Sequence, residues 1–163
     1  LKISELEASP DLQHFSNIDL QDILTDLAEF YEPMASEKHI ALHTQIEKAV
    51  VRGERNLLTQ AFANLLDNAI KFTPKHGHIY ITTTRHGDKV DVSISDSGTG
   101  IPEIYREKVF EKFFRIEESR HTKGNGLGLS LVAAIARIHK AEIILSDNGP
   151  GLKVTLRLPA NPL

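Results

Sequence analysis

The chain has 163 residues, 40% hydrophobic and 25% charged, a composition that is typical of one globular domain with a buried core. Its net charge of -3 does not provide the basic surface that nucleic-acid binding needs, and a sequence without cysteine has no disulfide and no thiolate metal site. No apolar run approaches the ~20 residues of a membrane-spanning helix. We therefore expect no nucleic-acid partner and a cytoplasmic location.

Residues 1–15 are predicted to precede the domain rather than to form part of it. Apolar side chains recur at helical spacing from Leu1 until Pro10, and a proline usually ends a helix. We expect the last turns of a preceding helix and a linker here, followed by the domain at residues 16–160. Because the chain starts at Leu1 and at once has a helical pattern, we expect it to be a piece of a longer protein.

Hydrophobic spacing predicts the elements of the domain. After a break at residues 16–19, Asp19 is expected to cap a helix whose apolar stripe runs to Tyr31. The most regular pattern, over residues 54–72, predicts a long helix that Thr73 and Pro74 end. The other predicted elements are short strands at 40–46 and 50–51, a hairpin of strands at 78–84 and 89–96, a short helix after Pro102, an apolar helix following Gly128, and two closing strands at 141–145 and 152–158.

The long helix carries a polar edge beside its apolar stripe. At about 100° per residue, Gln60, Asn64, Asn68 and Lys71 fall on one arc. Two carboxamides one turn apart next to a core need several hydrogen-bond partners, which a ligand or a metal ion can supply. Hydrogen bonds from Asn64 and Asn68 to loop backbone are the alternative.

A glycine turn follows the predicted strand that ends at Asp96. In the run Asp96-Ser97-Gly98-Thr99-Gly100, the glycines let the backbone turn sharply and let a flat ligand approach the main chain. An ionised carboxylate at this place only accepts hydrogen bonds, so it can recognise an exocyclic amine. The alternative is a plain corner between a strand and a helix.

The region between this turn and the last helix combines an aromatic cluster, a polar stretch and glycines. Residues 110–114 contain three phenylalanines, which can anchor the polar stretch 116–125 in the manner of a lid. Gly124, Gly126 and Gly128 then lead directly into a helix, whose unpaired amides and positive dipole favour phosphate. Neither the dinucleotide fingerprint nor the P-loop pattern occurs.

His76 and His78 have a spacing that can hold a metal ion on one side of a strand. Two ligands are too few for a closed site, and no cysteine or nearby carboxylate cluster completes one. Solvated turn histidines are the expected interpretation.

Four stretches occur in a typical order and spacing: residues 64–74, 96–102, 110–115 and 124–130. They resemble the N box, first glycine box, F box and second glycine box of the ATP-binding catalytic domain of sensor histidine kinases, in the gyrase, Hsp90, histidine-kinase and MutL superfamily. The resemblance covers nearly the whole chain, and it implies that residues 1–15 are the tail of a preceding dimerisation helix and a linker. It implies an α+β fold of the Bergerat type, a two-layer α/β sandwich with a mixed, mostly antiparallel sheet of about five strands packed on three helices.

The resemblance also implies the cofactors, ATP and Mg²⁺, and the residues that hold them. Asn64 and Asn68 would hold Mg²⁺, Asp96 would accept a hydrogen bond from the adenine amino group, and Asn64, Lys71 and Arg115 would be catalytic. The implied nucleotide-binding residues are Asn68, Lys71, Asp96, Gly98, Gly100, Ile101, Phe110, Phe113, Gly124, Gly126, Leu127, Gly128 and Leu129.

The implied reaction is transfer of the γ-phosphoryl group of ATP to a histidine of a separate dimerisation domain in the same parent protein. None of the eight histidines here lies in the phosphoacceptor motif of the family. A response regulator is the implied further partner, and a dimeric parent anchored in the inner membrane is left open. The alternatives are an ATP hydrolase of the gyrase or Hsp90 type and a non-catalytic module for nucleotide sensing or docking.

Two departures from the family pattern stand near the C-terminus. The family often has two glycines after the histidine that ends the last helix, whereas Lys140 and Ala141 follow His139 here. Leu152 stands where the family usually has threonine, so a hydroxyl near the base is in doubt.

Overall fold

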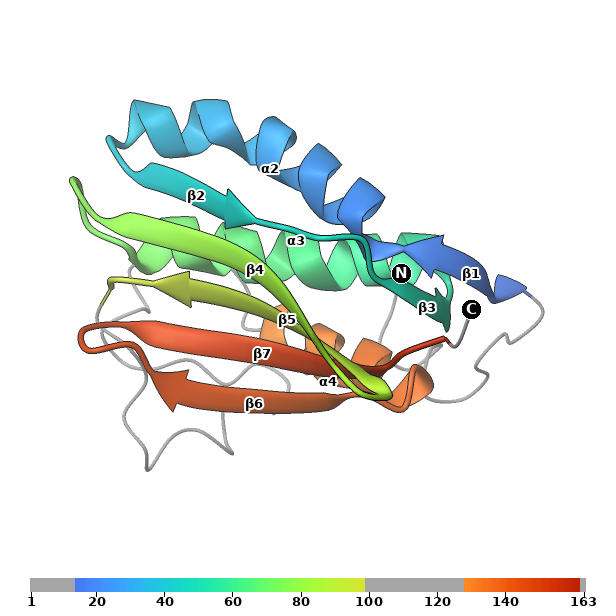
Figure 1. Cartoon of the computed structure of the whole chain (residues 1–163). Helices are drawn as coiled ribbons and strands as arrows, with labels where there is room; N and C mark the ends of the chain where they lie inside the picture. The colour runs from blue at the N-terminus through green and yellow to red at the C-terminus, as the bar shows by residue number, and fades with distance from the viewer. Residues whose placement is uncertain (1–13, 99–127, 162–163) are drawn as a thin grey trace.

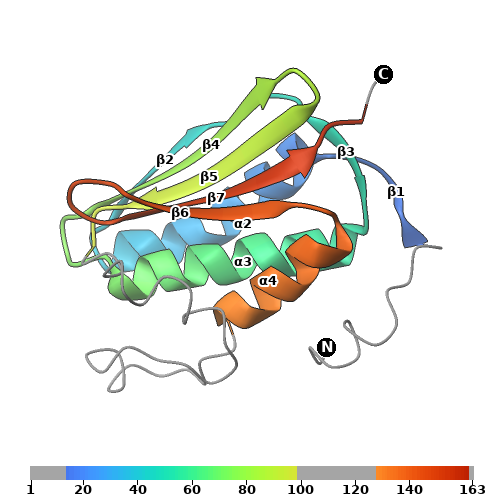
Figure 2. The ribbon, with the colours of Figure 1, turned by 90° about the horizontal axis from the view of Figure 1, so that it is seen from below.

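The computed structural model describes residues 14–98 and 128–161. Within these ranges three helices lie on one side of a sheet (Figures 1 and 2). In chain order the elements are β1 (Ser16–Asp19), α2 (Leu20–Glu37), β2 (Ala41–Gln45), β3 (Val50–Gly53), α3 (Arg55–Phe72), β4 (His78–His86), β5 (Lys89–Asp96), α4 (Gly128–Ile138), β6 (Glu142–Asp147) and β7 (Leu152–Pro159).

The main sheet has five strands in the order β2-β4-β5-β7-β6. Only the β2–β4 pair is parallel, because the chain passes through α3 between these two strands, and the other pairs are antiparallel. The three helices cover one face of this sheet, as the view from below shows (Figure 2). This confirms the predicted α+β sandwich with its mixed, mostly antiparallel sheet. None of the helices in the described ranges is long and apolar enough to cross a membrane.

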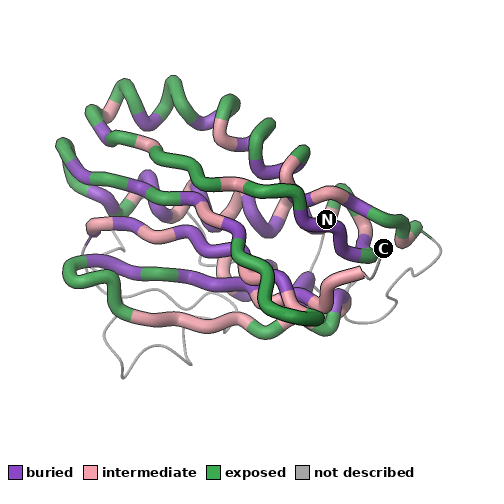
Figure 3. Tube along the Cα trace, in the orientation of Figure 1, coloured by how far each residue is buried: buried purple, intermediate pink, exposed green. Residues whose placement is uncertain are grey.

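Alternation along the strands decides which face meets the helices. In β5, Val90, Val92 and Ile94 are buried on the helix side, while Asp91 and Ser95 on the opposite face are only partly covered. The central strands β5 and β7 are mostly buried and the edge strand β2 is mostly exposed (Figure 3). The opposite face of the sheet is therefore polar.

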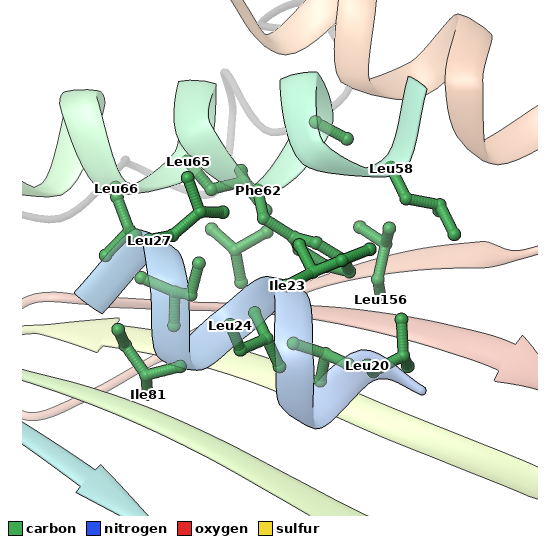
Figure 4. Close-up of a cluster of buried hydrophobic side chains, with 14 of the residues drawn as sticks. Leu20, Ile23, Leu24, Leu27, Leu58, Phe62, Leu65, Leu66, Ile81 and Leu156 are labelled. Carbon is green, nitrogen blue, oxygen red and sulfur yellow. The ribbon is translucent and has the colours of Figure 1, made fainter. Parts of the chain in front are cut away.

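The core lies where α2 and α3 meet the sheet. Leu24 of α2, Phe62 and Leu66 of α3, Ile81 of β4 and Leu156 of β7 are all fully buried and converge on one cluster (Figure 4). Full burial of each such side chain contributes about 1.5–3 kcal/mol relative to exposure. The helix with the predicted polar edge is thus held along its length by its apolar rows.

Residues 16–19 were expected to be a break and are instead strand β1. They pair antiparallel with β3, with Ser16 opposite Gly53 and Asp19 opposite Val50. Only Ile18 of this strand is buried, so the segment carries no alternation from which a strand could be predicted. The strand exists because a distant segment supplies its hydrogen-bond partners.

Side chains cap both long helices. Asp19 Oδ1 accepts a hydrogen bond from the Gln21 amide at 3.0 Å, which confirms the predicted cap of α2. Glu54 caps α3, because its carboxylate accepts a hydrogen bond from the Leu57 amide at 2.8 Å. At the other end of α3, the Lys38 ammonium donates to the Ile70 carbonyl at 2.8 Å, where the negative end of the helix dipole favours a cation.

The turn after α4 is made without glycine and is fastened by a buried histidine. Lys140 takes a left-handed φ of 55°. The His139 ring donates from Nδ1 to the Ile135 carbonyl at 2.8 Å and accepts at Nε2 from the Glu54 amide at 3.0 Å. Phe15 stacks on the same ring, with centroids 4.9 Å apart. Burial lowers the pKa of His139, so the ring is neutral in the folded protein.

The lowered pKa of His139 predicts that the stability of the domain depends on pH. Because the folded pKa lies below the ordinary value of 6.5, the unfolded chain binds a proton more readily, and the free energy of unfolding should fall as the pH drops below about 6.5. Urea unfolding at pH 7.5 and pH 5.5 measures this loss. His139→Gln should be less stable at pH 7.5 but should lose less on acidification. An equal loss in both proteins would contradict the prediction.

Candidate functional site

Three segments meet at one end of the domain: the C-terminal half of α3, the turn after β5, and the start of β7. The start of α4 lies against α3, since a Cβ placed on Gly128 would be 3.3 Å from Asn68 Nδ2. The fold therefore brings together Asn68 and Gly128, which the sequence separates by a long stretch of chain.

The polar edge of α3 forms as predicted. Gln60, Asn64, Asn68 and Lys71 are all half-buried, between the buried rows and solvent. Neither Asn64 nor Asn68 hydrogen-bonds to another residue of the described ranges, 14–98 and 128–161. Their oxygens are therefore not committed to the backbone in those ranges.

Asp96 ends β5 on the helix side of the sheet and is only 7% exposed. Its Oδ1 accepts from the Gly98 amide at 2.9 Å and from the Leu152 amide at 3.3 Å. Burial raises the pKa of this carboxyl group, and the two backbone hydrogen bonds lower it by less. A buried carboxylate whose charged form is disfavoured is typical of a functional site.

The backbone around Asp96 leaves no room for side chains at two glycines. A Cβ on Gly98 would overlap the Phe72 carbonyl oxygen, so the turn lies directly against the end of α3. Gly151, with a φ of 110°, packs against the Asp96 carbonyl, and Asn148 Nδ2 donates to the same oxygen at 2.7 Å. Main-chain contacts thus fix the position of Asp96.

Leu152 shows how the chain accommodates its departure from the family pattern. Its side chain is buried, and its amide donates to Asp96 Oδ1. A backbone group therefore makes a contact with the carboxylate at this position. No side-chain hydroxyl is present there.

Two residues beside the site were not predicted from the sequence. Thr73 is fully buried, and its Oγ1 has no hydrogen-bond partner within the described ranges. Phe72 is 39% exposed, one helical turn beyond Asn68. The signal for Phe72 was an aromatic residue at the polar end of the helix, and the sequence marked Thr73 only as a residue that ends this helix.

Some of the remaining predicted site residues lie in the described ranges of the chain, and the others lie outside them. Leu129 is half-buried and packs against the core. The helix expected after Pro102, the phenylalanine anchor and the lid at 116–125 lie outside the described residues, as do Gly100, Ile101, Phe110, Phe113, Arg115, Gly124, Gly126 and Leu127.

The contact between Gly151 and Asp96 predicts a difference between two neighbouring glycines. Gly149→Ala, at a φ of 51° with nothing within 4 Å, should cost about 1 kcal/mol for the left-handed conformation alone. Gly151→Ala drives a methyl group into the Asp96 carbonyl and should cost about 3 kcal/mol or more. Chemical denaturation of both variants measures this. Equal destabilisation would show that the close contact is not significant.

Comparison with known proteins identifies the family. Residues 53–162 match the family described as "Histidine kinase-, DNA gyrase B-, and HSP90-like ATPase". The chain is 38% identical over 146 residues to the adaptive-response sensory kinase SasA of Synechocystis sp., covering 85% of this chain and 38% of that protein. It is 32% identical over 166 residues to the sensor-like histidine kinase SenX3 of Mycolicibacterium smegmatis, covering 99% and 43%. The chain thus spans about two fifths of these curated relatives.

Solved structures show the same fold. The mycobacterial sensor histidine kinase MprB superposes with a TM-score of 0.84 at 27% identity, covering 91% of this chain and all of that one. Full-length ShkA in complex with AMPPNP gives 0.86 at 25% identity, covering 99% and 34%. ThkA in complex with the response regulator protein TrrA gives 0.77 at 28% identity, covering 91% and 42%. The chain belongs to the histidine kinase-, DNA gyrase B- and HSP90-like ATPase family, as a catalytic domain of the protein histidine kinase type.

Proposed function

We propose that this domain binds Mg·ATP and transfers the γ-phosphoryl group to a histidine on a separate dimerisation domain of its parent protein. The observation that carries the proposal is the arrangement of the site. A buried carboxylate, Asp96, lies behind a glycine turn that touches the end of α3, and Asn68 on the same helix meets the start of α4. The complex of ShkA with AMPPNP, an ATP analogue, supports the choice of nucleotide.

The base would be recognised by Asp96. Its Oδ1 is engaged by two backbone amides, and a carboxylate oxygen can accept the adenine amino group. Gly98 packs against the end of α3, which fixes the turn against which a planar base would lie. The exposed ring of Phe72 is a candidate surface for stacking.

The phosphates would lie between α3 and α4. The first amides of α4, which begins at Gly128, are unpaired within the helix and favour an anion. Lys71 ends the polar edge of α3 and supplies a positive charge for the phosphates. This places the triphosphate along the edge that carries Asn64 and Asn68.

Asn64 and Asn68 fit a Mg²⁺ ion that the nucleotide helps to hold. Amide oxygens are hard donors, and Mg²⁺ commonly takes one or two protein ligands together with waters and phosphate oxygens. The described residues contain no group of three histidine or acidic side chains that could enclose a metal without a nucleotide. When bound, the ion would neutralise charge on the phosphates. The protein's own contribution is to position the nucleotide and exclude water.

Transfer to histidine explains the polar edge better than hydrolysis does. An ATP hydrolase needs a carboxylate to activate water where this chain has Asn64, and an amide is a poor base. The one carboxylate on α3, Asp67, raises the pKa of Tyr31 of α2, after the larger effect of burial on that phenol. The charge of Asp67 therefore affects a residue of α2. Because Asn64 supplies no carboxylate to activate water, hydrolysis of ATP should be slow.

The partners follow from the same assignment. We propose that residues 1–15 are the tail of the helix and the linker that join this domain, at 16–160, to the phosphoacceptor domain. The complex of ThkA with TrrA supports a response regulator as the further partner. A dimeric parent protein stays a prediction. Its location, cytoplasmic or anchored in the inner membrane, also stays a prediction.

Phosphotransfer tests the proposal and the role of Asn68 together. Radiolabelled Mg·ATP is mixed with this domain and the separately produced histidine domain of the parent protein, and label on the histidine is measured. Asn68→Ala should abolish transfer and leave the melting temperature nearly unchanged, because a half-buried polar side chain contributes little packing. Asn56→Ala, an exposed asparagine on the same helix, is the control and should transfer normally. Normal transfer by folded Asn68→Ala would refute the metal role, and no transfer by the unmodified domain would refute the function.

Asp96→Asn tests base recognition separately from folding. The variant retains an acceptor for the Gly98 and Leu152 amides but presents an amide group to the base. ATP should bind about ten- to a hundredfold more weakly, the equivalent of about 1.5–3 kcal/mol, and GTP should be affected much less. Since burial raises the pKa of Asp96, the ionised form costs stability at neutral pH, and the variant should melt no lower than the unmodified protein. Equal losses for both nucleotides would contradict the adenine assignment.

A further inference from the structure

A pair of histidines lies on the polar face of the sheet, opposite the helices. His43 is on β2 and His78 begins β4, and the parallel pairing of these strands places His43 opposite Tyr80. Nε2 of His43 and Nδ1 of His78 are 3.1 Å apart, and both residues are exposed. Tyr80 stacks on the His43 ring with centroids 4.5 Å apart.

The distance between these nitrogens suits two ligands of one metal ion. With metal–nitrogen bonds of about 2.0–2.1 Å, two adjacent ligands lie about 2.8–3.4 Å apart, depending on the coordination angle. The two ring planes differ by 19°, so each ring must turn about its Cβ–Cγ bond to face a shared ion. That torsion is broad for histidine, and the exposed rings have room to turn.

We propose that His43 and His78 form a binding site for a borderline divalent transition cation, with Zn²⁺ as the representative ion. Imidazole nitrogens favour Zn²⁺, Ni²⁺ and Cu²⁺ over Mg²⁺, which prefers oxygen. Both rings bind as neutral imidazoles, with the proton of His43 on Nδ1 and that of His78 on Nε2. No third histidine or acidic side chain joins the pair among the described residues, and water completes the coordination.

The site is connected to the turn that follows Asp96. The His78 amide donates to Ser97 Oγ at 2.9 Å, and the Ser97 amide donates to the His78 carbonyl at 3.1 Å. The backbone of one metal ligand is thus bonded to the residue next to Asp96. The proposed cation site is nevertheless separate from the Asn64 and Asn68 edge, because its side chains lie on the opposite face of the sheet.

Calorimetric titration of the nucleotide-free protein with Zn²⁺ at pH 7.5 tests the proposal. One ion should bind per chain, and Mg²⁺ at the same concentrations should give no signal. His43→Gln and His78→Gln should each bind Zn²⁺ about tenfold or more weakly, and circular dichroism checks that both variants are folded. Two separate variants are used so that a folding defect in one does not decide the result.

His86→Gln is the matched control. His86 lies on the same strand and the same face, but its Nε2 hydrogen-bonds to Asp91 at 2.8 Å. It should bind Zn²⁺ as the unmodified protein does. The proposal is overturned if the unmodified protein binds no Zn²⁺, if either substitution of the pair leaves the affinity unchanged, or if His86→Gln weakens binding as much as they do.

Discussion

The burial of an ionisable carboxylate at the end of a central strand is the constraint on which the functional end of this domain depends. Asp96 projects to the helix side of the sheet, where burial disfavours its charge. Two backbone amides, from the turn after β5 and from the start of β7, offset part of that cost. No cation pairs with it in the part of the chain that the structure describes. The strand end is therefore held by groups that only a close approach of three backbone segments can supply, and this explains the glycines at 98 and 151.

Helix α3 serves both the core and the site. Its apolar rows, which include Phe62 and Leu66, pack against α2 and the sheet and fix the axial rotation of the helix. That rotation in turn places Asn64 and Asn68 half-buried on one edge, next to the start of α4. The two ends of α3 are fastened by side chains from other elements, since Lys38 donates to carbonyls at its C-terminus and the amide of its capping residue, Glu54, donates to His139. The position of the polar edge thus depends on contacts well away from the nucleotide.

The two faces of the sheet carry different chemistry, and the same alternation along the strands produces both. The buried residues of the helix side are apolar except for Asp96 and Thr83. Thr83 accepts a hydrogen bond from the Glu47 amide, in the loop before β3. The other side is polar and includes the bidentate pair of Asp91 with Arg157 across β5 and β7. The histidine pair, His43 in the middle of β2 and His78 at the start of β4, lies on this second face. The backbone of His78 is hydrogen-bonded to Ser97, in the turn that follows Asp96.

The sequence alone determined the elements with a regular hydrophobic pattern, which are the capped helix α2, the long helix α3 and the hairpin of β4 and β5. The same pattern placed the polar edge with Asn68 on α3. Resemblance to a known family added the mixed, mostly antiparallel sheet and the expected roles of Asp96 and Asn64, and the structure supplied the order of the strands. The tertiary structure alone decided that residues 16–19 form a strand, that His139 bonds to the cap of α3, and that His43 meets His78. These contacts join segments far apart in the chain, so no local hydrophobic pattern predicts them. They form only when the buried rows of the helices have fixed where the distant partners lie.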